Sequence, residues 1–191
     1  MKAVFGLGNP GRAYTLTRHN VGFEVIDLCR KVYRLRRKGR IESSALVYST
    51  GDFLLVKPMT FMNDSGAAVR CALSRHGVSP ADALVVYDDL DLPLGRIKVL
   101  RAGGAGTHKG MTSILNALGT EEIPRLRIGI EVEERTETGR DFVLDRFTPV
   151  EWMRVLPALE SAVDAIDLFR RADIDAVMTR FNRRNGSLAE V

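Results

Sequence analysis

Short apolar segments that alternate with helical patterns constrain this chain more than any other feature. Ala3–Leu7, Ala83–Tyr87 and Leu126–Ile130 are mainly apolar and have the length of buried strands. From Val21 to Val32, apolar residues instead recur at helical spacing with charged residues on the other face, and Asn20 is the expected N-cap. Strands that alternate with helices predict an α/β sandwich with a mixed, mostly parallel twisted sheet.

Local signals place the remaining elements. Thr50-Gly51-Asp52 lies between two apolar runs and predicts a β-hairpin. Thr148-Pro149-Val150-Glu151 combines a capping box with an N-terminal proline and predicts the start of a long helix. Further elements are predicted as helices at 65–76, before Gly119 and at 173–181, and as a strand at 96–100. Because no internal repeat or linker is seen, we expect residues 1–191 to form one three-layer domain with a hairpin insertion.

The composition is that of a globular protein, since 45% of the 191 residues are hydrophobic and 27% are charged. The longest stretch without charged side chains runs from Gly110 to Thr120, well short of the roughly 20 residues that cross a bilayer. The N-terminus reaches glycine and proline before an apolar run of signal-peptide length can form. We therefore expect a cytoplasmic protein without a membrane segment, and the lack of an obvious exposed apolar stripe favours a monomer.

Charge is unevenly distributed along the chain. The net charge is +4, and residues 1–40 hold ten basic side chains against two acidic ones. This excess is compatible with a polyanionic partner, although the run from Arg34 to Arg40 also fits a solvated loop. Cys29 and Cys71 lie among helix-spaced apolar residues, so both are expected to be reduced core residues. With three histidines and no Cys-x-x-Cys spacing, neither a metal site nor a cofactor is predicted.

A glycine motif after the first strand raises the possibility of dinucleotide binding. Gly6-Leu7-Gly8-Asn9-Pro10-Gly11 matches G-x-G-x-x-G. A polar loop from Arg12 to His19 then separates it from the next helix, and Asp27, the acid about 20 residues on, lies inside that helix. The hypothesis that the chain is a dinucleotide-dependent oxidoreductase is therefore supported by this glycine pattern alone. The loop at 103–110 lacks the Gly-Lys-Ser/Thr of a P-loop.

Two histidines and an acidic cluster are candidates for chemistry. His19 precedes a helix N-terminus, where the helix dipole is expected to lower its pKa and favour the neutral, proton-accepting form. His108 lies in the glycine-rich loop and is a candidate for binding. Asp88-Asp89-Leu90-Asp91 follows a buried strand; these acids fit an exposed turn, a Mg²⁺ ligand set, or a carboxylate that orients His19.

Several long motifs in series resemble those of bacterial peptidyl-tRNA hydrolases. In chain order they are Gly6-Leu7-Gly8-Asn9-Pro10-Gly11 with Tyr14, Thr17-Arg18-His19-Asn20-Val21-Gly22, Lys57-Pro58-Met59-Thr60-Phe61-Met62-Asn63-Asp64-Ser65-Gly66, Asp88-Asp89-Leu90-Asp91-Leu92-Pro93 and Arg125-Leu126-Arg127-Ile128-Gly129-Ile130. The similarity spans nearly the whole chain and is weaker at 34–44 and in the C-terminal region.

The resemblance implies hydrolysis of the ester that joins a peptide, or an N-blocked amino acid, to the 3′ end of tRNA. By this similarity His19 is the general base that activates water, and Asp88 holds its ring and stabilises the protonated form. Asn9 is implied to distinguish blocked from free α-amines. Asn63 is implied to bind the peptide or the developing oxyanion through its neutral amide.

The resemblance also implies how the RNA is bound. Tyr14 and Phe61 would line the site for the 3′-terminal nucleotide and peptide, and Arg127 would hold the 5′ phosphate. Where the family pattern has Gly-Gly-His-Asn-Gly, this chain has Gly106-Thr107-His108-Lys109-Gly110, so Lys109 replaces an asparagine. We expect Lys109 to contact the substrate still.

A catalytically idle RNA-binding homologue is the alternative, because relatives of this family serve as chloroplast splicing factors. Binding alone does not need a base with a carboxylate partner. The joint presence of Asn9, His19, Asn63 and Asp88 therefore favours an enzyme.

Overall fold

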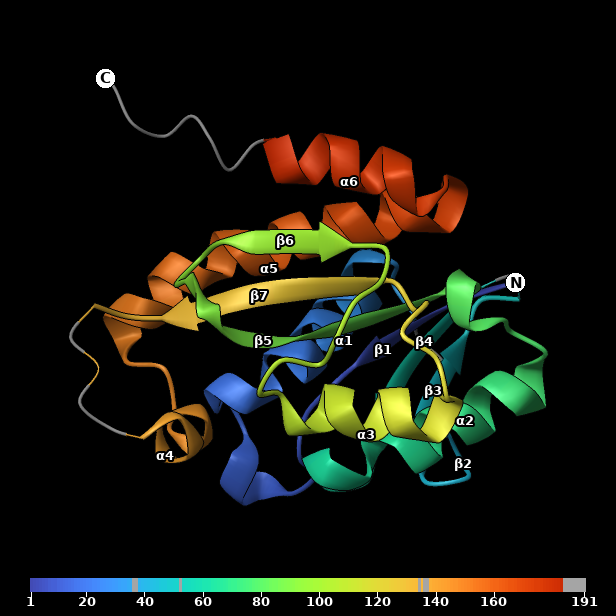
Figure 1. Cartoon of the computed structure of the whole chain (residues 1–191), viewed down its shortest axis with the longest axis horizontal. Coiled ribbons are helices and arrows are strands. Elements are labelled where there is room, and N and C mark those ends of the chain that lie inside the picture. Colours follow the sequence, from blue (N-terminus) through green and yellow to red (C-terminus); the bar gives the residue numbers. More distant parts are fainter. Residues whose placement is uncertain (36–37, 52, 134, 136–137, 184–191) are drawn as a thin grey trace.

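A seven-stranded sheet runs through the centre of the computed structural model, which describes residues 1–35, 38–51, 53–133, 135 and 138–183. The strand order is β2-β3-β4-β1-β5-β7-β6 (Figure 1). The strands are β1 (Lys2–Gly6), β2 (Arg40–Glu42), β3 (Ala45–Ser49), β4 (Phe53–Pro58), β5 (Ala83–Pro93), β6 (Ile97–Leu100) and β7 (Arg125–Glu131). β3 and β6 run opposite to the other strands, so the predicted mixed, mostly parallel sheet is confirmed.

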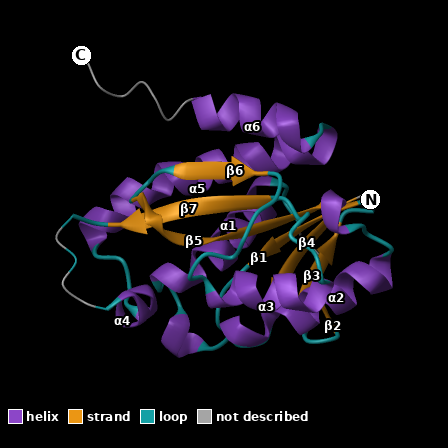
Figure 2. Cartoon of the chain, in the orientation of Figure 1, coloured by secondary structure: helices purple, strands orange, loops and turns teal. Residues whose placement is uncertain are grey.

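Helices cover both faces of this sheet, as Figure 2 shows. One face carries α1 (Val21–Val32), α5 (Pro149–Arg171) and α6 (Ile174–Arg183), and the other carries α2 (Ser65–His76) and α3 (Lys109–Leu118). Val4 packs into the first apolar layer and Phe5 into the second, so β1 is buried on both sides as its apolar run predicts. The three-layer α/β fold class is therefore confirmed.

Short helical turns shape the connecting loops. They are η1 (Arg12–Tyr14), η2 (Arg18–Asn20), η3 (Met62–Asp64) and η4 (Pro80–Asp82). Sequence patterns did not predict α4 (Gly139–Leu144), although Thr138 accepts a hydrogen bond from the backbone N–H of Asp141, which is a recognisable capping pattern. In the described ranges, none of the helices combines the length and the apolarity needed to span a membrane.

The structure corrects two sequence predictions and refines a third. The strand expected to end at Tyr87 continues to Pro93, because Asp88 and Asp89 still pair with β7 and so lie within a strand rather than in an exposed turn. The basic run is a loop in its described residues 34, 35, 38 and 39, as its charge suggests, except that Arg40 begins β2, which pairs with β3; residues 36 and 37 lie outside the described residues. Cys71 is exposed, not part of the core, whereas Cys29 is buried as expected.

Two glycines of the sequence motifs allow α1 to approach the end of β1. A Cβ on Gly22 would lie 2.4 Å from the backbone nitrogen of Leu7, and one on Gly6 would lie 2.2 Å from the backbone oxygen of Gly22. The Phe23 backbone N–H donates to the Leu7 carbonyl at 3.1 Å. Gly6 therefore serves helix–strand packing, while η1 and η2 separate the glycine motif from α1. This packing brings His19 to the carboxyl ends of the strands.

Candidate active site

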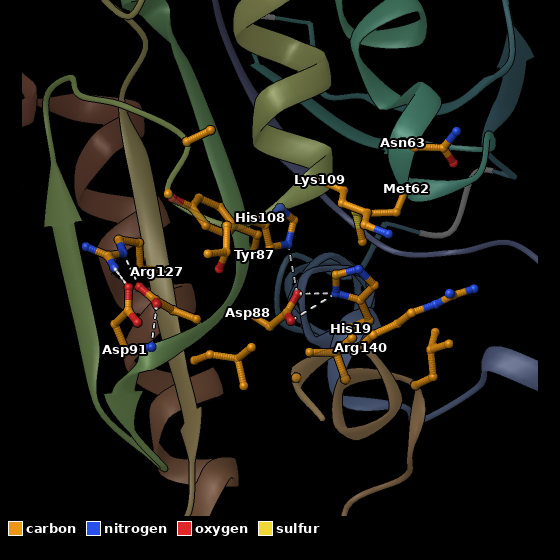
Figure 3. Close-up of a pocket in the computed structure, with 18 of the residues that line it drawn as sticks. His19, Met62, Asn63, Tyr87, Asp88, Asp91, His108, Lys109, Arg127 and Arg140 are labelled. Atoms are coloured by element: carbon orange, nitrogen blue, oxygen red, sulfur yellow. Dashed lines mark hydrogen bonds and ion pairs between the residues drawn. The ribbon is translucent and has the colours of Figure 1, made fainter. Parts of the chain in front are cut away.

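A pocket of about 940 Å³ opens beyond the carboxyl ends of β1 and β4 and beside β5. Every candidate residue predicted from the sequence lines it: Asn9, Tyr14, His19, Phe61, Asn63, Asp88, His108, Lys109 and Arg127. Figure 3 shows part of this lining. Residues from loops far apart in the chain meet here because parallel strands end at the same edge of the sheet.

His19 and Asp88 form a hydrogen-bonded pair at the buried end of the pocket. Gly6 of β1 pairs with Val86, so Asp88 lies just past the end of β1 and close to η2. Nδ1 of His19 lies 2.9 Å from each carboxylate oxygen of Asp88, whose residue is only 2% exposed. A carboxylate accepts but does not donate, so Nδ1 carries the proton. In the neutral ring, Nε2 then keeps a free lone pair, and in Figure 3 it lies on the side away from Asp88.

His108 is a second histidine partner of Asp88, which the sequence did not indicate. It is the N-cap of α3, where its Nδ1 accepts from the backbone N–H of Met111 at 3.1 Å. Its Nε2 must therefore carry the proton, and Nε2 lies 3.1 Å from Oδ1 of Asp88. The contact draws the glycine-rich loop to the same carboxylate that orients His19 (Figure 3).

The protonation states of this cluster follow from its charges. Burial lowers the pKa of His19, but the charge of Asp88 and its hydrogen bond outweigh burial, and the pKa ends above its ordinary value. The lowering expected from the helix N-terminus is therefore wrong in direction. Burial raises the pKa of Asp88, yet His19 and His108 overcome this and hold it far below the usual range. Asp88 is thus a carboxylate that stabilises an imidazolium on His19.

Asn9 is held by a reciprocal pair of hydrogen bonds with Asn20. The Asn9 backbone N–H donates to Oδ1 of Asn20 at 2.8 Å, and Nδ2 of Asn20 donates to the Asn9 carbonyl at 3.0 Å. Asn20 stands at the N-cap position of α1 as predicted, but its side chain makes these bonds instead of a capping bond. Oδ1 of Asn9 accepts from the backbone N–H of Met62 at 2.8 Å, so its amide NH₂ is the group left for a molecule in the pocket.

Aromatic and amide side chains form the rim. The rings of Tyr14 and Phe61 meet edge to face, with centroids 6.2 Å apart and planes at 78°. Phe61 is 54% exposed, an unusual exposure for a phenylalanine. Asn63 is also exposed, and its Nδ2 donates to Oδ1 of Asp64 at 3.4 Å. The rim therefore presents apolar faces and a neutral amide to solvent.

Arg127 lies at another part of the pocket wall and is already paired. Its guanidinium makes an ion pair with Asp89 and lies 3.7 Å from an oxygen of Asp91 (Figure 3). Burial lowers the pKa of Arg127, but the hydrogen bond and charge of Asp89 raise it above the ordinary value. An anion that binds Arg127 must share it with these acids.

Arg125 is a pocket residue to which the sequence motifs gave no role. Its guanidinium is almost fully buried and donates to three backbone carbonyls, those of Gly104 at 2.8 Å, Glu121 at 3.0 Å and Ile123 at 3.2 Å. It thereby fixes the glycine-rich loop to the start of β7.

α4 also lines the pocket, through Arg140, Val143 and Leu144. The capping pattern at Thr138 is a local signal from which this wall could have been predicted.

The buried cluster also has the chemistry of metal ligands. One ligand atom from each of His19, Asp88 and His108 lies within 4.8 Å of the others. A divalent metal bound by all three would displace the two ring protons that now face Asp88. The hydrogen bonds described above satisfy these groups with each other.

The fold and the site define an α/β protein in which a histidine, hydrogen-bonded to a buried carboxylate, lies in a pocket at the carboxyl ends of the strands, where ligands of such folds bind. Comparison with protein families makes this specific: the family model described as peptidyl-tRNA hydrolase matches residues 3–188. The chain belongs to the peptidyl-tRNA hydrolase family.

Individual relatives agree with this assignment. The chain is 42% identical to the peptidyl-tRNA hydrolase of Sulfurihydrogenibium sp. (strain YO3AOP1), covering 96% of this chain and 98% of the relative. It is 45% identical to that of Aquifex aeolicus (strain VF5), over 85% and 86% of the two chains. Among solved structures, peptidyl-tRNA hydrolase from Acinetobacter baumannii superposes with a TM-score of 0.87 at 28% identity, over 95% and 94% of the two chains.

Proposed function

We propose that this chain hydrolyses the ester between a peptide, or an N-blocked amino acid, and the 3′ end of tRNA, with His19 as the general base. The observation that carries the proposal is the His19–Asp88 pair, whose Nδ1 proton is bound by a buried carboxylate while Nε2 is left to take a proton from water. Such general-base assistance is worth roughly 10² to 10⁴ in rate. Family membership supports hydrolysis rather than a catalytically idle RNA-binding homologue.

Asn9 distinguishes blocked from free α-amines through the group that it offers. Its amide oxygen is held by the Met62 N–H, so the NH₂ donor is the group that Asn9 offers most readily to a ligand. The carbonyl of an N-acyl group or peptide bond accepts from that donor, whereas a free α-ammonium has no lone pair and cannot accept from it. Ordinary aminoacyl-tRNA is therefore a poor substrate.

The other predicted residues bind the substrate. Phe61 and Tyr14 offer aromatic faces to the 3′-terminal adenosine and the peptide, and Asn63 donates to a peptide carbonyl. Arg127 is the candidate for the 5′ phosphate, although it shares its charge with Asp89. Lys109 contacts the substrate in the pocket, and we assign His108 to hold Asp88 rather than the substrate.

The proposal is tested by supplying N-acetyl-aminoacyl-tRNA and free aminoacyl-tRNA to the wild-type protein and following release of the amino acid. We expect rapid release from the blocked substrate only, and loss of that release in His19→Ala. Equal release from both substrates, or an active His19→Ala variant, would refute the mechanism.

A second variant tests the selectivity directly. Asn9→Asp places an acceptor-only carboxylate where the NH₂ donor stood, so it should hydrolyse the blocked substrate more slowly and lose discrimination against the free α-ammonium. Asn9→Ala separates this effect from simple loss of the side chain. Unchanged discrimination in both variants would remove Asn9 from this role.

We also infer that the protein acts as a cytoplasmic monomer. The lack of an obvious exposed apolar stripe in the sequence favours a monomer. Its substrate arises during protein synthesis, which favours the cytoplasm. Light scattering on the purified protein should give a mass near 21.2 kDa; a stable dimer mass would refute the monomer.

A further inference from the structure

Lys109 is a cation that reaches into the pocket from the start of α3. It is the first residue of that helix, directly after the N-cap His108, and it lines the pocket with an exposed side chain. In Figure 3 the side chain extends toward the ring edge of His19 that faces away from Asp88. Lys109 and His19 line the same pocket, and the positive charge of Lys109 lowers the pKa of His19.

The local structure gives Lys109 no stabilising role. In the described part of the chain it makes no salt bridge and no side-chain hydrogen bond. The first turn of α3 contains no acidic residue, and a cation at a helix N-terminus is repelled by the partial positive charge of the helix dipole. A lysine at this position therefore costs some helix stability, so its side chain is better explained by function than by folding.

We infer that the Lys109 ammonium stabilises the oxyanion formed when water attacks the ester carbonyl. This inference rests on the proposed hydrolysis and assigns one charged group within it. It places Lys109 at the reacting carbonyl rather than on the phosphates of the tRNA body.

The chemical step creates two opposite charges, and each faces a complementary group. The water oxygen bonds to the carbonyl carbon, its proton passes to Nε2 of His19, and the carbonyl oxygen becomes negative. The positive ring then lies against Asp88 and the negative oxygen against Lys109, so charges alternate across the site. When the intermediate collapses, the bond to the 3′ ribose oxygen breaks and His19 returns its proton to that oxygen. Lys109 keeps its protons throughout.

The charges around His19 fit this arrangement. Asp88 contacts the ring from β5, and His108 and Lys109 approach from the start of α3. Arg140 lines the pocket from α4, while the neighbouring Arg18 is bound by Glu151 at 2.9 Å. Asp88 raises the pKa of His19 and Lys109 lowers it, so the ammonium also keeps more of the base in its neutral form at a given pH.

Three variants test the inference on N-acetyl-aminoacyl-tRNA. Lys109→Met should lower kcat about tenfold or more while KM changes less than about threefold, because it removes an interaction made mainly in the transition state. Its melting temperature should not fall, and the acid limb of its kcat/KM profile should move to higher pH as the pKa of His19 rises. Lys109→Arg should keep most of the activity, and Lys109→Gln should be intermediate. Lys31→Met, on the exposed face of α1, is the matched control.

A substrate without phosphates separates the two roles of the charge. In 3′-O-(N-acetyl-aminoacyl)-adenosine the ester is present but the phosphates are not, so the loss of kcat in Lys109→Met should persist. A rise in KM with unchanged kcat, or a defect that disappears on this substrate, would overturn the inference in favour of phosphate binding. No effect in any variant would also overturn it. Failure of the wild type to release the blocked amino acid would instead refute the proposed function.

Discussion

The buried end of the pocket and its rim differ in how far their side chains are exposed and in how many fixed hydrogen-bond partners they have. At the buried end, Asp88 is 2% exposed and both of its oxygens accept from histidine nitrogens, so this carboxylate has fixed partners. At the rim, Phe61 is 54% exposed and Asn63 is also exposed to solvent. Low dielectric and fixed partners make the first region suited to holding charge during a reaction, whereas the second can reorganise around a ligand.

This difference separates the expected effects of mutations. Changes at the buried end should act mainly on kcat, because they disturb groups that interact with the transition state. Changes at the rim should act mainly on KM, because they remove contacts made with the bound substrate. The predictions below test this division in order of decreasing effect.

Loss of the base should have the largest effect. His19→Ala removes the proposed general base, so kcat should fall roughly 10²- to 10⁴-fold on N-acetyl-aminoacyl-tRNA, with little change in KM. Single-turnover measurements would check this. His76→Ala is the matched control, since His76 pairs with Glu42 outside the pocket and its loss should leave kcat within about twofold.

Removing the charge of Asp88 should have the next largest effect. Asp88→Asn leaves one acceptor oxygen to serve two histidines, so the orientation of His19 is disturbed and kcat should fall about tenfold or more. Because Asp88 raises the pKa of His19, and the base must be neutral, the acid limb of kcat/KM should move to lower pH. An acid limb at the wild-type pH would contradict the assigned pairing. The shift is opposite in sign to that expected for Lys109→Met.

Removing an aromatic face from the rim should weaken binding. Phe61→Ala should raise KM about five- to tenfold, consistent with about 1 kcal/mol for stacking on one base, and leave kcat within about twofold. The melting temperature should not change because the ring is mostly exposed. Met153→Ala removes an exposed apolar side chain of α5 outside the pocket and should leave KM unchanged. A fall in kcat alone would mean that the rim takes part in chemistry.

Arg127 should give the smallest effect. Arg127→Met should raise KM only about two- to threefold, because its charge is already shared with Asp89, and should reduce the slope of log KM against log salt by about one. KM measured across a salt series would show this. Arg75→Met, whose native arginine pairs with Glu42 away from the pocket, should keep the wild-type slope. If Arg127→Met and Arg75→Met both keep the wild-type slope of log KM against log salt, Arg127 does not hold a phosphate.

Local patterns predicted the strands and helices of the layers well, because a buried strand and an amphipathic helix each require a characteristic order of apolar and polar residues. The apolar runs at Ala3–Leu7 and Leu126–Ile130, the capping box at Thr148 and the hairpin around Gly51 correspond to elements of the structure, with Asp52 outside the described residues. Cys71 was misplaced because helical spacing alone does not reveal which face of a helix meets the sheet. The end of β5 was missed because acids such as Asp88 look like turn residues until their partners are known.

The site was only partly predictable. Motif resemblance identified the candidate side chains, and all of them line one pocket. It did not reveal that His108 and His19 share one carboxylate, since those three residues are distant in sequence and meet only across the strand ends. The direction of the His19 pKa shift was wrong for the same reason: the helix dipole is a local feature, and a hydrogen-bonded carboxylate at 2.9 Å outweighs it.

By itself, the sequence determined the alternation of strands and helices, the family resemblance and the residue types available for chemistry. These depend on the order of apolar and polar residues and on short motifs, which are properties of the chain alone. The tertiary structure decided which side chains touch, which are buried and how their charges balance. Hydrogen bonds and Coulomb forces act over a few ångströms, and only folding sets those distances between His19, Asp88, His108 and Lys109.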